Sequence, residues 1–217
     1  MNAEPGFLQE VLTALTQFPD CDRDANLVID AMSIKKGKVY DRVSGKFVGL
    51  VDFGNESMNT SVEATEALYF MLVCLNGKWK LPIAYFLINK ITAKIQGELI
   101  NAALELTHKK AVRVQSITFD GASTNLATAR YLAKTNAADD YDEDYLFENI
   151  DLDVLDENDG LHDGLYEINA LEECEEGRAV NQFPHFFLHP KTKEKIYIIL
   201  DPSHMIKLAR NALGNEI

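Results

Sequence analysis

The dipeptide Asn76-Gly77 lies between two apolar runs, Ala67–Leu75 and Leu81–Ile88, and this arrangement limits the possible folds more than any other local pattern. An Asn-Gly pair between two strand-like runs is the strongest short-range signal for a β-hairpin. Pro82 near the start of the second run favours an edge position or a strand start, because proline cannot donate to a ladder. The sequence therefore predicts an antiparallel hairpin here.

Two further runs with strand character precede this hairpin, Leu27–Ile34 and Lys46–Phe53. The segment Asp41–Lys46 between them is rich in turn-forming residues, and we expect the two runs to form an antiparallel pair. Upstream of them, the apolar positions of Pro5–Phe18 recur at helical spacing and predict a lead-in helix within residues 1–22.

The apolar period changes after the hairpin. Gln96–Lys109 has the spacing of an amphipathic helix, and Val112–Phe119 returns to strand character. Later elements are a helix from Ser123 or Thr124 through Leu132, a strand at Lys195–Leu200 and a helix at Ser203–Leu213. This order predicts a mixed α/β fold, a mixed β-sheet flanked by helices as in ribonuclease H-like domains.

Acidic residues are concentrated in one block. Residues 139–176 contain 17 Asp and Glu and no Lys or Arg, which leaves 17 acids against all 21 Lys and Arg, a net charge of +4, in the remainder. Such a composition favours a solvated, partly disordered insertion. The sequence has neither an apolar run of membrane-spanning length nor a signal peptide, and its three distant cysteines suggest reduced thiols, so we expect an intracellular, soluble protein without a membrane partner.

Three aspartates lie at comparable places in the predicted strands. Asp30 lies within the first strand, and Asp120 and Asp201 end later ones. Ligands gather outside the carboxyl ends of parallel strands, so these carboxylates could converge. Two unit charges about 4 Å apart repel by roughly 4 kcal/mol at an effective dielectric constant near 20, a cost that a cation between them would remove. Magnesium or manganese suits such oxygen ligands, and two such ions would support nuclease or nucleotidyl-transfer chemistry.

Each candidate also has a structural interpretation. Asp201 precedes Pro202 and a helix, as an N-cap does, and Asp120 could simply end a strand in a turn. Asp30 is expected to be buried, where neither a cap nor a turn explains a charge, which favours a functional role.

Other polar residues are weaker candidates. His185 and His189 lie four residues apart in a strand-like run, which favours a surface or core role over a zinc site, whereas His204 could face the same site as Asp201. A basic group formed by Lys35, Lys36 and Lys38 could contact a DNA backbone or form an ordinary exposed turn. The sequence has no glycine-rich phosphate loop.

Four blocks of the sequence resemble the P-element transposase family, which includes animal proteins that carry THAP domains. They are LVIDAMSIKKGKVYDRVSGKFVGLVDFG, ATEALYFMLVCLNGKWKLPIAYFL, ITFDGASTN and ILDPSHMIKLARN. The resemblance runs from about Leu27 to Asn215 and excludes the acidic block. It implies a ribonuclease H-like domain with a DDE triad that binds magnesium for DNA cleavage and strand transfer. By motif position, Asp30 is similar to the first catalytic aspartate and Asp120 to the second, with Asp201 a further candidate metal ligand.

The family's third acid, a glutamate, lies beyond a GTP-binding insertion that follows the last of these motifs. The resemblance therefore predicts a partial ribonuclease H-like transposase domain at residues 23–217, with the acidic insertion at 139–176 and no GTP site of its own. The zinc finger of the family is also absent from the sequence. For the complete protein it implies transposon ends and target DNA as partners, homo-oligomers and a nuclear location. The chain alone is expected to be inactive.

Two alternatives remain. One is a domesticated module that binds DNA or protein without catalysis. The other is a different ribonuclease H-like nuclease that finds its last acid within this chain, with Glu98 or Asp201 as candidates. Metal titration separates the first from a transposase, and the distances among the acids test the second.

Overall fold

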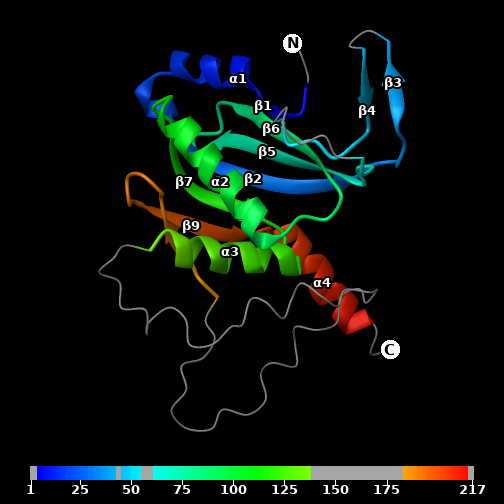
Figure 1. Ribbon diagram of the computed structural model, residues 1–217. Helices are drawn as coiled ribbons and strands as arrows, with labels where there is room; N and C mark the ends of the chain where they lie inside the picture. Colours follow the sequence, from blue (N-terminus) through cyan, green and yellow to red (C-terminus); the bar gives the residue numbers. More distant parts are fainter. Residues whose placement is uncertain (1–3, 43–44, 55–60, 138–182, 215–217) are drawn as a thin grey trace. The chain divides into compact units, whose positions relative to one another are not determined.

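The computed structural model describes residues 4–42, 45–54, 61–137 and 183–214. Within them, seven strands form one sheet in the order β1-β6-β5-β2-β7-β9-β8 (Figure 1). In chain order these strands are β1 Gly6–Phe7, β2 Asp24–Ser33, β5 Glu66–Cys74, β6 Lys80–Ile88, β7 Arg113–Phe119, β8 Phe186–Leu188 and β9 Lys195–Leu200. The acidic insertion predicted at residues 139–176 lies outside the described residues.

This sheet has an antiparallel part and a parallel part. β2, β5 and β6 form an antiparallel meander, whereas β7 pairs parallel with both β2 and β9. β2 and β7 are parallel neighbours and need a crossover connection. The chain makes it through β5, β6 and then α2, Ala93–His108, which joins β6 to β7. The mixed sheet flanked by helices is therefore confirmed, and so is the hairpin of β5 and β6 around Asn76-Gly77.

The predicted pairing of the first two strand-like runs is wrong. β2 pairs with β5, from Ala25 opposite Cys74 to Ser33 opposite Glu66. The second run instead contributes β4, Lys46–Val48, which pairs with β3, Val39–Asp41, in a separate two-stranded sheet. The turn-rich segment Asp41–Lys46 does connect two antiparallel strands, but these are β3 and β4 and not β2 and a neighbour in the main sheet.

The lead-in segment is also more varied than predicted. β1 pairs with β6 at the edge of the main sheet before α1, Gln9–Ala14, begins. Two short 3-10 turns follow at Leu15–Gln17 and Asp20–Asp22. Val11, Leu12 and Leu15 are buried, so the apolar period correctly indicated which side of this segment faces the core.

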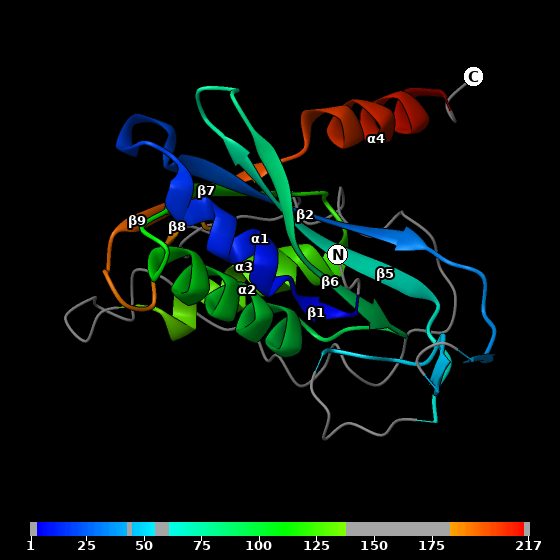
Figure 2. The same cartoon turned by 90° about the horizontal axis from the view of Figure 1, so that it is seen from above.

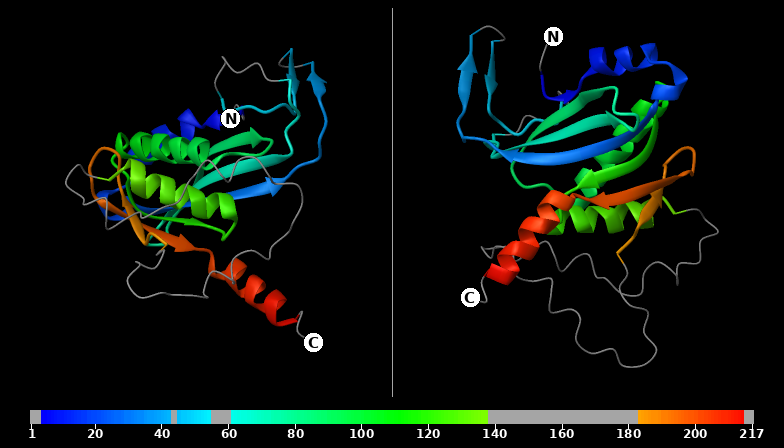
Figure 3. Two further views of the ribbon diagram at one scale, coloured as in Figure 1. Left: turned by 60° about the horizontal axis from the view of Figure 1, so that its bottom comes forward. Right: turned by 180° about the vertical axis from the view of Figure 1, so that it is seen from behind.

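One face of the sheet packs against two helices, α2 and α3, Ser123–Thr135. Alternation along β2 and β7 buries Leu27, Ile29, Ile117 and Phe119, each no more than 2% exposed. Gly97 of α2 lies against the Tyr131 ring of α3, where a Cβ would overlap the ring, so this glycine permits the two helices to approach closely. α4, Pro202–Gly214, leaves β9 on the opposite side of the sheet from α2 and α3 (Figures 2 and 3).

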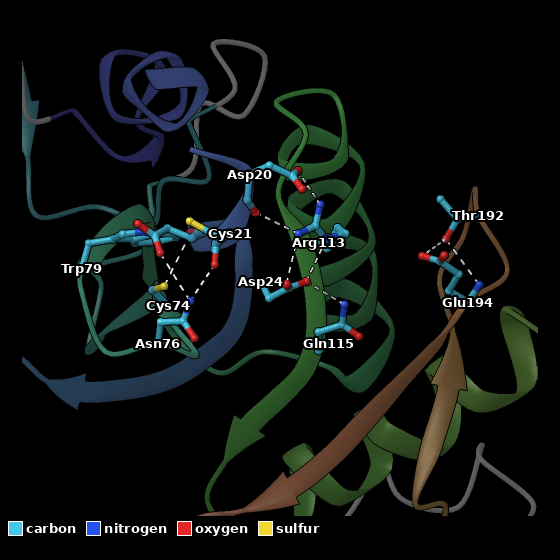
Figure 4. A network of polar contacts seen from close by, with 11 residues as sticks. Asp20, Cys21, Asp24, Cys74, Asn76, Trp79, Arg113, Gln115, Thr192 and Glu194 are labelled. Carbon is cyan, nitrogen blue, oxygen red and sulfur yellow. Dashed lines mark hydrogen bonds and ion pairs between the residues drawn. The ribbon is translucent and has the colours of Figure 1, made fainter. Parts of the chain in front are cut away.

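A group of charged residues joins the amino ends of β2 and β7 (Figure 4). Arg113 at the start of β7 donates from Nε and Nη2 to the two carboxylate oxygens of Asp24, at 2.8 and 3.0 Å, and from Nη1 to Asp20 at 2.9 Å. These hydrogen bonds lower the pKa of the Asp24 carboxyl and raise that of the guanidinium. A bidentate pair of this kind fixes which residues of two adjacent strands lie opposite one another.

His189 is a buried core residue in the turn between β8 and β9, which agrees with the structural role predicted for it. Its Nδ1 accepts the backbone N–H groups of Lys191 and Thr192, both at 3.1 Å. The proton of the neutral ring therefore lies on Nε2, which is 3.3 Å from the carbonyl oxygen of Leu104. Protonation of Nδ1 would break both backbone hydrogen bonds.

We expect His189 to make the folded state less stable in acid. Burial lowers the pKa of the ring, which the hydrogen bond to the Leu104 carbonyl partly opposes, and smaller effects of His108, Glu194 and Glu105 leave the pKa lowered. Because the unfolded chain binds this proton more readily, the contribution is complete above the ordinary pKa near 6.5 and falls as the pH drops below it, by at most about 1.4 kcal/mol per pH unit. Urea unfolding between pH 7.5 and 5 should show a weaker pH dependence for His189→Asn than for the unmodified chain.

His185→Asn is the matched control, because His185 is exposed in the same segment. Its unfolding free energy should follow the pH dependence of the unmodified chain. An equal flattening by both substitutions would contradict a specific role for His189.

Candidate functional site

The three aspartates lie toward the carboxyl ends of three adjacent parallel strands, Asp30 three residues before the end of β2 and Asp120 and Asp201 directly after β7 and β9. Val28 of β2 pairs with Thr118 of β7, and Thr118 pairs with Ile199 of β9. Asp30, Asp120 and Asp201 each follow this row by two residues. The backbone N–H of Asp201 also donates to the carbonyl of Phe119 at 2.9 Å, which continues the β7–β9 ladder to the aspartate. The fold thus brings all three to one edge of the sheet.

These carboxylates share an edge without forming a closed cluster. Among the described residues, no group of three His, Cys, Asp or Glu side chains is arranged to hold a metal ion. Glu98, a candidate for the third acid, is exposed on α2 and accepts a hydrogen bond from the Tyr131 hydroxyl at 2.6 Å. The part of the chain that the structure describes therefore gives no support to a nuclease with all three acids within it.

Asp30 is exposed, and the expectation that it would be buried is wrong. Burial alternates along β2 as far as Ile29, after which Asp30, Ala31, Met32 and Ser33 are all exposed. The cause is that β2 extends past β7. The pairing of β2 with β7 ends at Val28, whereas its pairing with β5 continues to Ser33. The carboxylate therefore keeps its hydration, and its Oδ1 accepts the N–H of Ala31 at 2.9 Å.

Asp120 is held by a chain of amides that the sequence did not reveal. Its Oδ1 accepts the backbone N–H of Ala122 at 3.0 Å and a hydrogen bond from Asn125 Nδ2. Asn125 Oδ1 in turn accepts Nε2 of Gln96 at 2.6 Å, and Gln96 is 2% exposed on α2. The buried amide thus fixes Asn125, and Asn125 fixes one oxygen of Asp120.

Asp201 caps α4, as the sequence predicted. Its Oδ1 accepts the N–H of Ser203 at 3.0 Å, and its carbonyl accepts the N–H of Met205 at 3.1 Å. Pro202 occupies the first helical position, where a missing N–H costs nothing. His204, half-buried on the first turn of α4, lies three residues beyond Asp201.

The three aspartates share one pattern. In each, Oδ1 accepts a hydrogen bond from a backbone N–H one or two residues further along the chain. Oδ2 of each accepts no hydrogen bond from the described residues. The second oxygen is therefore available to a cation or to water, which suits an oxygen-ligated divalent metal.

We expect Asn125→Ala to destabilise the domain by about 1–2 kcal/mol, because it leaves the buried Gln96 amide without its acceptor. Urea unfolding measures this change. The double substitution Gln96→Leu with Asn125→Ala removes both partners and should recover part of the stability. If the double variant is as unstable as the single one, the unpaired Gln96 amide is not the cause of the loss.

Comparison with known proteins supports the resemblance seen in the motifs. The family model described as "TNP-like, RNase H N-terminal domain" matches residues 3–133. The human protein named DNA transposase THAP9 is 25% identical over 109 residues, which are 49% of this chain and 12% of that protein. A solved structure titled "Drosophila P element transposase strand transfer complex" is similar in fold, with a TM-score of 0.60 at 16% identity.

That structural match covers 97% of this chain but 34% of the Drosophila chain, so the chain spans about a third of the length of this relative. The residues that the family model matches include Asp30 and Asp120, whereas the model ends before Asp201. Among the described residues, no helix has the length and apolar character needed to cross a membrane.

Proposed function

Because the chain belongs to the family of TNP-like RNase H N-terminal domains, we propose that it is the first part of the catalytic domain of a P-element-like DNA transposase. In this proposal, Asp30 and Asp120 are two of its metal-binding acids. The observation that carries the proposal is the parallel register of β2, β7 and β9, which ends in an aspartate on each strand. The substrate is DNA, with transposon ends and target as the partners of the complete protein.

The chemistry of the donors fits magnesium or manganese. Each aspartate offers a carboxylate oxygen without a hydrogen-bond partner among the described residues, and hard divalent cations take such ligands. A bound ion would supply a Lewis acid that activates water for hydrolysis of a phosphodiester and stabilises the charge of the leaving oxygen. Asp30 and Asp120 would hold the ion, with Asp201 as a further candidate.

The residues around these acids orient them. The rigid strand β2 carries Asp30 with its carboxylate solvated, so exchange of water for a cation requires little rearrangement. Asn125, backed by buried Gln96, restricts Asp120 to an orientation in which one oxygen stays free. Metal-assisted phosphoryl chemistry tolerates displacements of only about 0.5 Å, and a second layer of hydrogen bonds of this kind is what such a site needs.

The complete protein would cleave DNA with water and then join the resulting 3′-hydroxyl to target DNA. A third acid, GTP binding and homo-oligomer formation belong to this complete protein in the proposal, and we assign none of them to a residue of this chain. A nuclear location follows from the DNA substrate.

One observation favours a second candidate function, a transposase-derived module that binds DNA without catalysis. The described residues contain no group of three His, Cys, Asp or Glu side chains arranged so that it could hold a metal ion. Such a module would keep the edge aspartates as solvated surface groups and would gain no stability from divalent ions.

Metal titration tests the first proposal. A ligand that binds only the folded state stabilises it by RT ln(1 + [L]/Kd), about 1.4 kcal/mol at ten times the dissociation constant. We expect Mn²⁺ and Mg²⁺ to raise the unfolding free energy of the chain and Asp30→Asn to abolish this gain. Removal of one of several neighbouring carboxylates should leave the metal-free stability equal or slightly higher.

Glu10→Gln is the control of equal charge change, because Glu10 is exposed on α1. It should keep the full stabilisation by Mn²⁺. No stabilisation of the unmodified chain, or an equal gain in Asp30→Asn, would reject the metal site and favour the second candidate.

We also expect the 217-residue chain to leave DNA uncut, because two or three acids without a closed metal cluster cannot clamp both the attacking and leaving oxygens. The assay is cleavage of labelled duplex DNA in Mg²⁺ or Mn²⁺. Cleavage that Asp30→Asn and Asp120→Asn both abolish would mean that the acids within this chain suffice.

A further inference from the structure

Residues 33–51, of which 43 and 44 lie outside the described residues, contain the β3–β4 ribbon, whose two strands form a sheet of their own. Val39 pairs with Val48, Tyr40 with Phe47 and Asp41 with Lys46. Figures 1 and 3 show the two strands projecting beyond the end of β2 that carries Asp30. A two-stranded hairpin by itself is at best marginally stable, so its extension from the body suggests a partner.

Large apolar side chains on this ribbon are exposed. The exposed fractions are 60% for Val39, 54% for Tyr40, 55% for Phe47 and 46% for Val48. Clustered exposure of this kind marks an interaction surface rather than a scatter of single surface residues.

The two faces of the ribbon differ in chemistry. Side chains alternate along a strand, so the paired residues Val39 and Val48 lie on one face and the paired residues Tyr40 and Phe47 on the other. The two rings meet edge to face, with centroids 5.2 Å apart. Lys38 Nζ lies 4.2 Å from the centroid of Phe47, so this lysine shares the aromatic face.

The ribbon is also the basic part of an acidic chain. Residues 33–51 contain four lysines and one arginine against a single acid, a net charge of +4, in a chain of net charge −13. Four of these cations, Lys35, Lys36, Lys38 and Arg42, are exposed, and exposed cations of this density can meet an anionic partner.

We propose that the β3–β4 ribbon is a DNA-binding arm that takes double-stranded DNA. The major groove of B-form DNA, about 12 Å wide, admits a two-stranded β-ribbon, and lysines and arginine at its base and sides would reach phosphates. The exposed rings of Tyr40 and Phe47 then lie against sugar and base edges. Lys38 on the aromatic face and the exposed cations beside the ribbon favour duplex DNA over a protein partner.

The arm also lies close to the candidate metal site. The arm begins at the end of β2, three residues beyond Asp30, so DNA bound to it passes the edge of the sheet where the aspartates lie. This consequence rests on the proposed function, whereas DNA binding by the arm needs no metal. Binding measured in a chelator therefore tests the arm without testing the metal site.

The test is fluorescence anisotropy of a labelled duplex with the whole chain in EDTA, at several salt concentrations. We expect Lys35→Ala/Lys36→Ala/Lys38→Ala to weaken binding about tenfold or more at low salt. The slope of log K against log salt should become shallower by about 0.9 for each phosphate that the variant no longer neutralises. Lys109→Ala/Lys110→Ala/Lys134→Ala removes equal charge from the ends of α2 and α3 and should change affinity less than twofold.

A second pair of variants separates the two faces of the ribbon. Tyr40→Thr/Phe47→Thr should weaken binding about fivefold with an unchanged salt slope, because rings carry no charge. Val39→Thr/Val48→Thr keeps strand propensity and should bind nearly as the unmodified chain does.

Several results would overturn the proposal. They are no binding by the unmodified chain at low salt, equal weakening in the two lysine triple variants, and equal weakening in the two ribbon-face variants. The proposal would also be overturned, in favour of a protein interface, if the Tyr40→Thr/Phe47→Thr variant lost self-association in sedimentation experiments but kept its DNA affinity. Because every binding measurement is made in EDTA, a failed metal titration leaves these results unaffected.

Discussion

Two parallel ladders, β2 with β7 and β7 with β9, run side by side in the middle of the sheet, and the candidate site depends on their register. A slip of one residue would move each buried side chain to the opposite face. Leu27 and Ile117 fix the register on the helix-covered face by their burial. On the other face Asn26 fixes it, since its amide contacts the hydroxyls of Ser116 and Thr118 at 2.9–3.3 Å. Apolar and polar forces therefore select the same alignment.

That alignment also limits the electrostatic repulsion among the three aspartates. Burial ends close to where the parallel pairing ends, so Asp30 is exposed and Asp120 and Asp201 are only half-buried. Charges near solvent interact through a high effective dielectric constant, so the repulsion among these three carboxylates is weaker than it would be in a buried site. The other charged group of the sheet lies at the amino ends, where Arg113 pairs with Asp24. Structural ion pairing and candidate chemistry thus occupy opposite ends of the same strands.

Local signals predicted much of this fold, and the candidate acids stood out because each interrupts or ends an apolar run. Asn76-Gly77 located the β5–β6 hairpin, and the change of period located α2 and β7 to within a few residues. The partner of β2 was not predictable in this way, because its pairing with β5 closes a long loop that no turn signal reports. The exposure of Asp30 depends on where β7 stops, which is a property of a neighbouring strand. Gln96 and Asn125 lie 29 residues apart on different helices, and nothing in either local sequence marks them as partners.

The support of the two principal acids differs, and this difference has a physical consequence. Asp30 is oriented by its own strand and one adjacent N–H, whereas Asp120 depends on a chain of amides that reaches the buried side of α2. The position of Asp120 is therefore coupled to the packing of α2 on α3, which Gly97 makes close. Asp30 is instead coupled to the ribbon that continues β2. Asp30 and Asp120 thus lie on adjacent, paired strands but are oriented by different neighbours, Asp30 by its own strand and Asp120 by the helical layer.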